Sequence, residues 1–181
     1  MDYIKKPKLL IIECISREER LNESLILYEF LKMSAPKRIH SIRCSSKDEV
    51  LKYLETKENL TGYQYVHLSG HGDAQNCVFK TPKGAIAPQE FPRGCFSGKT
   101  VTLSACDLGK KEFIEPFLDT TVARFAIAPQ REVLFIDAAL WYTIFYYNAL
   151  HVGNKPDCSY DKTQKSLYIK GAFRFWLSTP A

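Results

Sequence analysis

The chain lacks the long apolar segment that a membrane-spanning helix requires. None of its hydrophobic runs approaches the roughly 18 consecutive apolar residues that would suggest such a helix. Residues 1–7 also contain no apolar stretch like the core of a secretory signal peptide. We therefore expect a cytoplasmic protein that has no membrane partner.

Paired metal-ligand motifs are missing as well. The six cysteines are scattered without a CxxC pair, so we expect reduced thiols and no disulfide framework. His67, His71 and Cys77 are close in sequence, but their spacing matches no common zinc pattern. We expect neither a metal nor another cofactor, and we interpret His67 as a packed residue that is hydrogen-bonded inside a sheet.

Positive charge is not concentrated in any segment. The formal net charge of +5 is spread along the chain, with no basic block that carries interleaved aromatic residues. A solvated surface explains such a distribution, and we expect no direct binding of nucleic acid.

What the chain does have is enough apolar material for one substantial core. Its 181 residues are 45% hydrophobic and 13% aromatic, and they contain no internal repeat. This length suits one α/β domain, and two independent cores would be cramped. We expect residues 1–181 to form a single domain.

Short apolar runs alternate with helical patterns along the chain. The run Leu-Leu-Ile-Ile at residues 9–12 is typical of a strand that is buried on both faces. We expect strands at residues 8–15, 38–44, 63–70, 101–105 and 122–128, helices after the first and second of these, and a long core helix at 132–150. This order predicts an α/β fold with a doubly wound, mostly parallel sheet flanked by helices.

Capping signals indicate where the first two helices begin. Ser16 with Glu19, and Ser46 with Glu49, match the capping-box pattern at a helix start. The first helix would then bury an apolar stripe made of Leu21, Leu25, Tyr28 and Leu31.

Three further segments have weaker local signals. Pro116 should interrupt a helix over residues 110–119, so we expect it to be broken or to start late. A turn sequence between residues 76–80 and 84–87 predicts a small hairpin. Residues 171–177 alternate as in an edge strand, although a helix is also compatible with them.

His71 and Cys106 each follow directly after an apolar run. If both runs are neighbouring parallel strands, the two residues emerge at the carboxyl edge of the sheet, where ligands bind in such folds. A thiol with an adjacent imidazole forms a cysteine nucleophile and its base. Taken singly, such a cysteine is more often a small buried residue, and such a histidine is more often part of a turn.

Residues beside this pair supply further candidates. The backbone amides of Gly72 and Cys106 are expected to form an oxyanion hole, which stabilises a developing negative oxygen. Asp73 and Asp137 would bring charge to a substrate pocket, although solvent-facing or capping roles are the alternative for both. Ser104, two residues before the thiol, is the third candidate substrate-binding residue.

The two motifs together resemble the catalytic elements of caspase-like cysteine peptidases of clan CD. His-Leu-Ser-Gly-His-Gly at 67–72 and Leu-Ser-Ala-Cys-Asp at 103–107 carry the resemblance, which covers residues 63–150 and is closest to the CHAT-domain branch. It implies a caspase-hemoglobinase fold with His71 as general base, Cys106 as nucleophile and Gly72 in the oxyanion hole. It also implies that a dyad suffices without a third carboxylate.

The chain departs from caspases proper in two respects. Ser104 occupies the position at which caspases have glutamine, so a preference for aspartate is not expected. Residues 106–122 leave no long loop of the kind that caspases cleave during maturation. We expect a single-chain enzyme that is controlled by a partner protein or by the ordering of a loop.

We therefore expect a cysteine endopeptidase that cleaves a protein substrate through a thioester. The resemblance implies a regulated effector in a bacterial defence system with an activating protein partner. The alternatives are a catalytically silent caspase-like interaction module and a cysteine hydrolase or transferase that acts on small amides.

Overall fold

A six-stranded sheet forms the centre of the molecule in the computed structural model, which describes residues 6–19, 22–167, 169 and 171–178. The strand order is β2-β1-β3-β7-β8-β9, and each neighbouring pair is parallel except β8 with β9. The strands are β1 Leu9–Glu13, β2 Ile39–Arg43, β3 Tyr65–Ser69, β7 Thr100–Ser104, β8 Phe125–Pro129 and β9 Phe173–Leu177. The doubly wound, mostly parallel sheet predicted from the sequence is confirmed.

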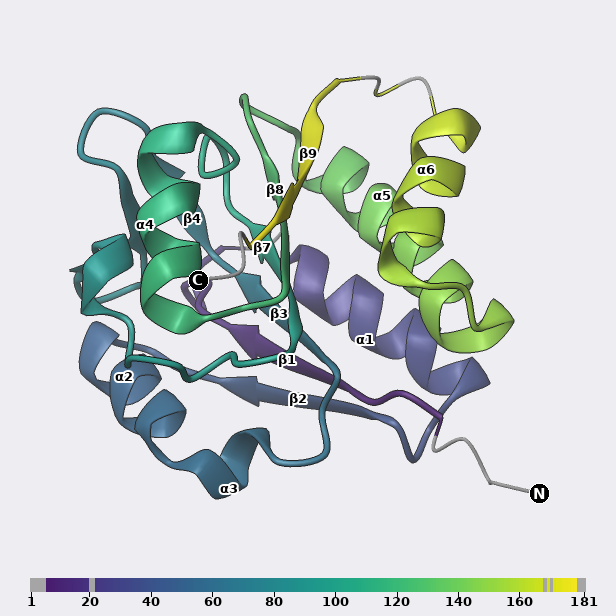
Figure 1. The fold of residues 1–181 in the computed structure, drawn as a ribbon, viewed down its shortest axis with the longest axis horizontal. Helices are drawn as coiled ribbons and strands as arrows, with labels where there is room; N and C mark the ends of the chain where they lie inside the picture. The colour runs from purple at the N-terminus through teal and green to yellow at the C-terminus, as the bar shows by residue number, and fades with distance from the viewer. Residues whose placement is uncertain (1–5, 20–21, 168, 170, 179–181) are drawn as a thin grey trace.

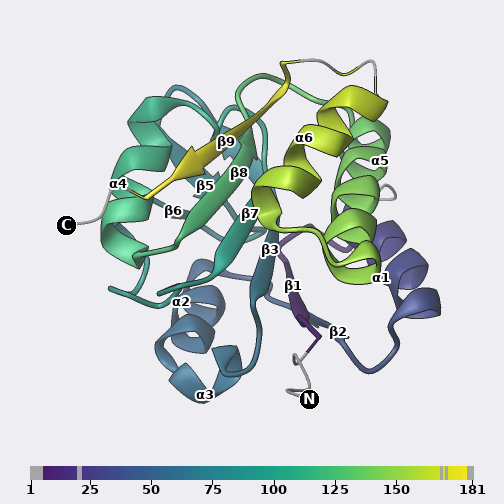
Figure 2. The same cartoon turned by 45° about the vertical axis from the view of Figure 1, so that its right-hand side comes forward.

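Helices cover both faces of this sheet, as Figures 1 and 2 show. One face carries α1 Glu23–Ser34, α5 Phe135–Tyr146 and α6 Pro156–Ser166. The other carries α2 Lys47–Glu55, α3 Lys57–Leu60 and α4 Lys111–Thr121. None of the helices in the described part of the chain is long and apolar enough to cross a membrane.

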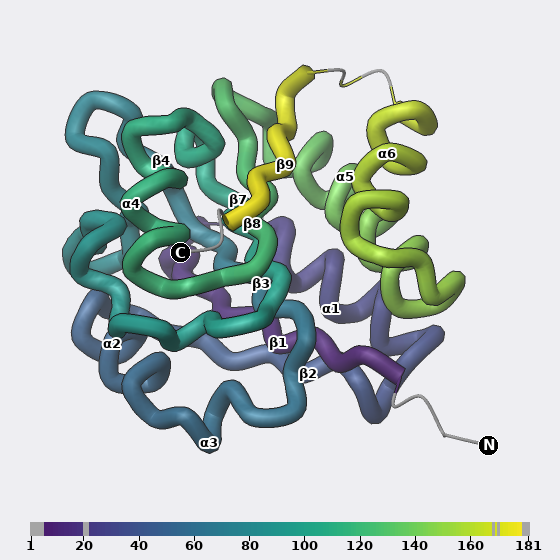
Figure 3. The backbone as a smooth tube through the Cα atoms, in the orientation of Figure 1, coloured from purple at the N-terminus to yellow at the C-terminus, as the bar shows by residue number. Residues whose placement is uncertain are grey.

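The central strands are apolar because both of their faces are buried. All five residues of β1 are buried, and they alternate between the two cores: Leu10 and Ile12 pack under α2 and α4, whereas Leu9 and Ile11 pack under α1 and α5. At one edge of the sheet, β2 buries only Ile39 completely, which agrees with its mixed apolar and polar sequence. The other edge strand, β9, runs back beside β8 in Figure 3, which confirms the expected edge strand at residues 171–177.

A second, three-stranded sheet lies beyond the carboxyl ends of β3 and β7. It consists of β4 His71–Asp73, β5 Val78–Lys80 and β6 Ala85–Ile86, followed by a short 3-10 helix at Pro88–Glu90. The predicted hairpin of β5 and β6 is confirmed. The sequence did not reveal β4, which pairs His71 with Lys80.

The predicted start of the first helix is wrong. Helix α1 begins at Glu23 and is capped by Asn22, whose Oδ1 accepts from the amides of Ser24 at 3.0 Å and Leu25 at 3.4 Å. Residues 17 and 18 form a separate turn, and the helix that follows buries Leu27 and Leu31. Leu25 of the predicted stripe is 55% exposed, and Leu21 lies outside the described residues.

The cap of α2 is confirmed in part. The Ser46 hydroxyl accepts from the Glu49 amide at 3.2 Å, as a capping box requires. The Glu49 carboxylate, however, accepts from the amide of Ser45, and not from that of Ser46.

The predicted break at Pro116 is also wrong, because α4 runs through it. Phe113, Ile114, Phe117 and Leu118 are buried on both sides of the proline, and this packing holds the helix together. The long aromatic helix is confirmed, although α5 begins later than expected and continues as a π-helical segment, Tyr147–Val152.

Candidate active site

Two neighbouring strands bring the candidate residues to one edge of the sheet. Strands β3 and β7 are parallel and in register, so Ser69 lies opposite Ser104 where both strands end. The Gly70 amide donates to the Ser104 carbonyl at 3.1 Å and continues the pairing by one residue. His71 and Cys106 therefore leave the sheet side by side.

The backbones at these two positions are in direct contact at Gly72. A Cβ atom at Gly72 would lie 1.7 Å from the carbonyl oxygen of Cys106 and 3.2 Å from its nitrogen. Only glycine fits at such a distance. The close approach brings the two predicted oxyanion-hole residues into contact.

A cavity of about 720 Å³ opens over this contact. It is lined by His71, Gly72, Asp73 and Cys106, together with Ala74, Gln75, Lys80, Asp107 and the segment 132–134. Two further candidates are not among its lining residues. Ser104 is buried at the end of β7, and Asp137 lies in the first turn of α5.

The Cys106 thiol lies against the backbone of the segment that precedes α5. The Val133 amide donates to the sulfur at 3.4 Å, and the sulfur lies 3.6 Å from the Val133 carbonyl oxygen. The thiol is thus half-buried between the end of β7 and this segment.

The imidazole of His71 is held on two sides. Its Nε2 lies 2.9 Å from the Glu19 carboxylate, and its ring packs edge-on against Phe135 with 5.7 Å between the ring centroids. The sequence did not identify Glu19 as a residue of this site, because its position after Ser16 suggested a helix cap. The available signal was that the segment after β1 leaves the sheet next to β3.

The carboxylate of Asp73 is already paired. A hydrogen bond from Lys80, at 2.8 Å, and further bonds from Asn76 hold its pKa well below the usual range. Asp73 is therefore ionised and fixes the turn that follows β4. Glu132, which also lines the cavity, is exposed and has no ion-pair partner among the described residues.

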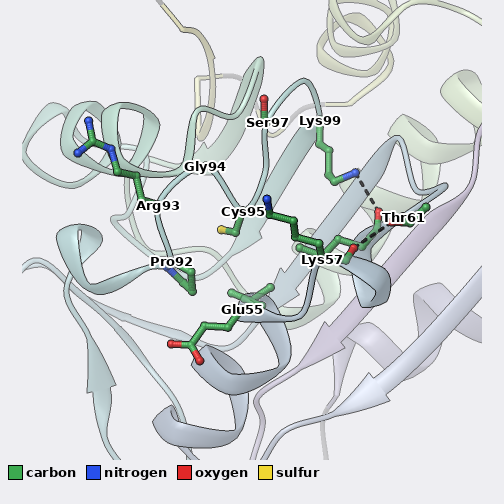
Figure 4. Close-up of a pocket in the computed structure, with 11 residues that line it drawn as sticks. Glu55, Lys57, Thr61, Pro92, Arg93, Gly94, Cys95, Ser97 and Lys99 are labelled. Atoms are coloured by element: carbon green, nitrogen blue, oxygen red, sulfur yellow. Dashed lines mark hydrogen bonds between the residues drawn. The ribbon is translucent and has the colours of Figure 1, made fainter.

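Three of the other cysteines are poorly suited to nucleophilic chemistry. Burial raises the pKa of Cys95 to about 12 and that of Cys44 to about 11, and it also raises the pKa of Cys14 well above its usual value. Cys95 lines a different cavity of about 340 Å³ between α2, α3 and residues 92–99 (Figure 4). These thiols stay protonated at neutral pH.

His67 is buried inside the sheet, as the sequence indicated. It contacts the Glu23 carboxylate at 2.7 Å through Nε2 and the Thr102 hydroxyl at 2.6 Å through Nδ1. Within the described ranges, no group of three or more histidine, cysteine or acidic residues is arranged to hold a metal ion.

The solved structures similar to this chain include two proteases. Caspase-1 from Spodoptera frugiperda superposes with a TM-score of 0.62 at 8% identity, over 96% of this chain and 86% of that protein. An inactive zymogen of a C11 protease from Parabacteroides distasonis gives 0.61 at 9% identity, over 95% of this chain but only 62% of the zymogen. No protein-family model matches the chain, and no curated protein matches its sequence. The chain has a caspase-like fold, as the two motifs predicted.

Proposed function

We propose that this protein is a cysteine endopeptidase in which Cys106 is the nucleophile and His71 is the general base. One observation carries the proposal: the backbones of residues 72 and 106 touch at the carboxyl edge of β3 and β7, and both reactive side chains line the cavity above them. The caspase-like fold supports it.

The reaction follows from these two groups. His71 takes the thiol proton, and the sulfur attacks the peptide carbonyl to form a tetrahedral oxyanion, which the amides of Gly72 and Cys106 stabilise. His71 then protonates the leaving amine as the C–N bond breaks, which leaves a thioester. Water, deprotonated by His71, attacks the thioester, and the acid product leaves while the thiol is regenerated. No cofactor takes part.

The substrate of this proposal is a protein chain that lies in the cavity. Asp73, Ser104 and Asp137 remain the proposed substrate-binding residues: Asp73 lines the cavity, whereas Ser104 is buried at the end of β7 and Asp137 lies in the first turn of α5. Glu132, which also lines the cavity and is exposed, adds a third carboxylate.

Regulation is proposed to depend on a protein partner and not on cleavage of the chain. Helix α4 occupies residues 111–121 of the segment between Cys106 and β8, so only short connections remain on either side and the segment offers no long loop for processing. We propose one peptidase domain over residues 1–181, a CHAT-like effector in the cytoplasm of a bacterium, acting in defence and binding neither nucleic acid nor membrane.

The test is covalent labelling with a peptidyl chloromethyl ketone, read by intact mass. Wild-type protein should gain one adduct, Cys106→Ala should gain none, and His71→Ala should react on the order of 100-fold more slowly. Cys158→Ala, which removes an exposed thiol on α6, should label as the wild type does. Labelling that is indifferent to both site substitutions would instead favour the catalytically silent interaction module.

A further inference from the structure

The proposed function gives no role to the Glu19 carboxylate, although this group contacts the proposed general base. Its Oε2 lies 2.9 Å from Nε2 of His71, and the two side chains are 33% and 45% exposed. The resemblance to dyad peptidases gives this residue no role, so the contact needs an explanation of its own.

The position of Glu19 follows from the sheet. Strand β1 is parallel to β3, with Glu13 opposite Ser69, so the segment after β1 leaves the same edge as His71. A turn then directs the segment: the Glu19 amide donates to the Ser16 carbonyl at 3.2 Å. Further along the chain, Asn22 caps the start of α1.

A carboxylate at this distance determines which ring nitrogen carries the proton. An ionised carboxylate only accepts hydrogen bonds, so Nε2 of the neutral ring must be protonated. The lone pair is then on Nδ1, which is the remaining nitrogen that can accept the Cys106 proton. The edge-on contact with Phe135 limits rotation of the His71 ring about the hydrogen bond between Nε2 and Glu19.

We propose that Glu19 is a positioning residue for His71, which fixes the tautomer and the orientation of the imidazole and stabilises the imidazolium that forms during catalysis. This inference rests on the proposed function. Ion pairs between half-exposed side chains contribute little to stability. Removal of the carboxylate should therefore affect catalysis and leave folding nearly unchanged.

The experiment compares Glu19→Gln and Glu19→Ala with Glu18→Gln, which makes the same charge change at the neighbouring, exposed position. Both Glu19 variants should lower kcat on a peptide substrate by about tenfold to 100-fold with KM nearly constant. The Glu18 variant should match the wild type. All three should keep the wild-type midpoint of urea unfolding.

A second readout does not depend on turnover. Nitrogen-15 spectra resolve the tautomers of the four histidines, and His71 is assigned by its loss in His71→Ala. The wild type should show His71 protonated at Nε2, and Glu19→Ala should show a mixture of tautomers.

The two readouts separate the possible failures. An unchanged tautomer in Glu19→Ala would overturn the inference even in an active enzyme. A changed tautomer with unchanged kcat would also overturn it, because positioning would then have no catalytic effect. Absence of Cys106-dependent labelling in the wild type would overturn the proposed function itself.

Discussion

At the scale of single residues, the candidate site depends most closely on Gly72. Its α-carbon lies so near the Cys106 carbonyl that any side chain must push the two segments apart. Such a movement would displace both the nucleophile and the amides that are proposed to bind the oxyanion. The proposed reaction thus depends on the close contact between the Gly72 α-carbon and the Cys106 carbonyl.

We expect Gly72→Ala to abolish labelling of Cys106 by the chloromethyl ketone and to lower the free energy of unfolding by about 1–3 kcal/mol, as overpacking does. Labelling is read by intact mass and stability by urea denaturation. Gly62→Ala is the control: its φ of +84° brings backbone strain, but no atom lies within 4 Å of the new Cβ. That variant should lose about 1 kcal/mol and still label normally. Normal labelling of Gly72→Ala would contradict the proposed geometry.

The sequence could predict some residues of the site but not others. His71 and Cys106 follow apolar runs, and the rule for parallel sheets then places them at one edge. Glu19 and Val133 reach the site through loops, whose paths depend on packing between segments far apart in the chain. No periodicity in the sequence records such a contact.

At the scale of elements, α4 shows how packing overrides a local rule. Pro116 is the sixth residue of the helix, so it cannot donate to the Glu112 carbonyl as a helical residue there normally would. The helix nevertheless continues, because apolar residues before and after the proline are buried against the sheet.

Pro116→Ala should therefore stabilise the protein. It restores an intrahelical hydrogen bond and removes a steric clash, although it also gives the unfolded chain more freedom. We expect a net gain of about 1–2 kcal/mol in the free energy of unfolding, measured by urea denaturation. Glu115→Ala, at an exposed position of the same helix, should change it by less than about 0.5 kcal/mol. A destabilised Pro116→Ala would mean that the core requires a bent helix.

A helix or strand could be predicted where its buried residues are apolar, and it was missed where they are polar. Strands β1, β3 and β7 are buried on both faces and appear as apolar runs. Helix α6 was not predicted, because its only fully buried residues are Ser159 and Thr163. It packs largely through Tyr160 and Gln164, which both hydrogen-bond to the Phe173 carbonyl.

At the scale of the whole molecule, a buried polar network joins the sheet to two helices. The Glu23 carboxylate at the start of α1 accepts from the Ser69 hydroxyl and contacts His67, both in β3. His67 in turn contacts Thr102 of β7, whose hydroxyl bonds to Tyr146 of α5. Every member is buried, and the network ends two residues before His71.

Glu23→Ala should lower the free energy of unfolding by about 3–5 kcal/mol, because it leaves His67 and Ser69 buried without their shared partner. Glu29→Ala removes an exposed carboxylate from the same helix and should change stability by less than about 0.5 kcal/mol. Urea unfolding at neutral pH measures both. Since whole domains are stable by only about 5–15 kcal/mol, the Glu23 variant should retain a small part of the original stability. A loss below about 1 kcal/mol would show that α1 is held to the sheet by its apolar residues alone, and that the strand before the candidate histidine does not depend on this network.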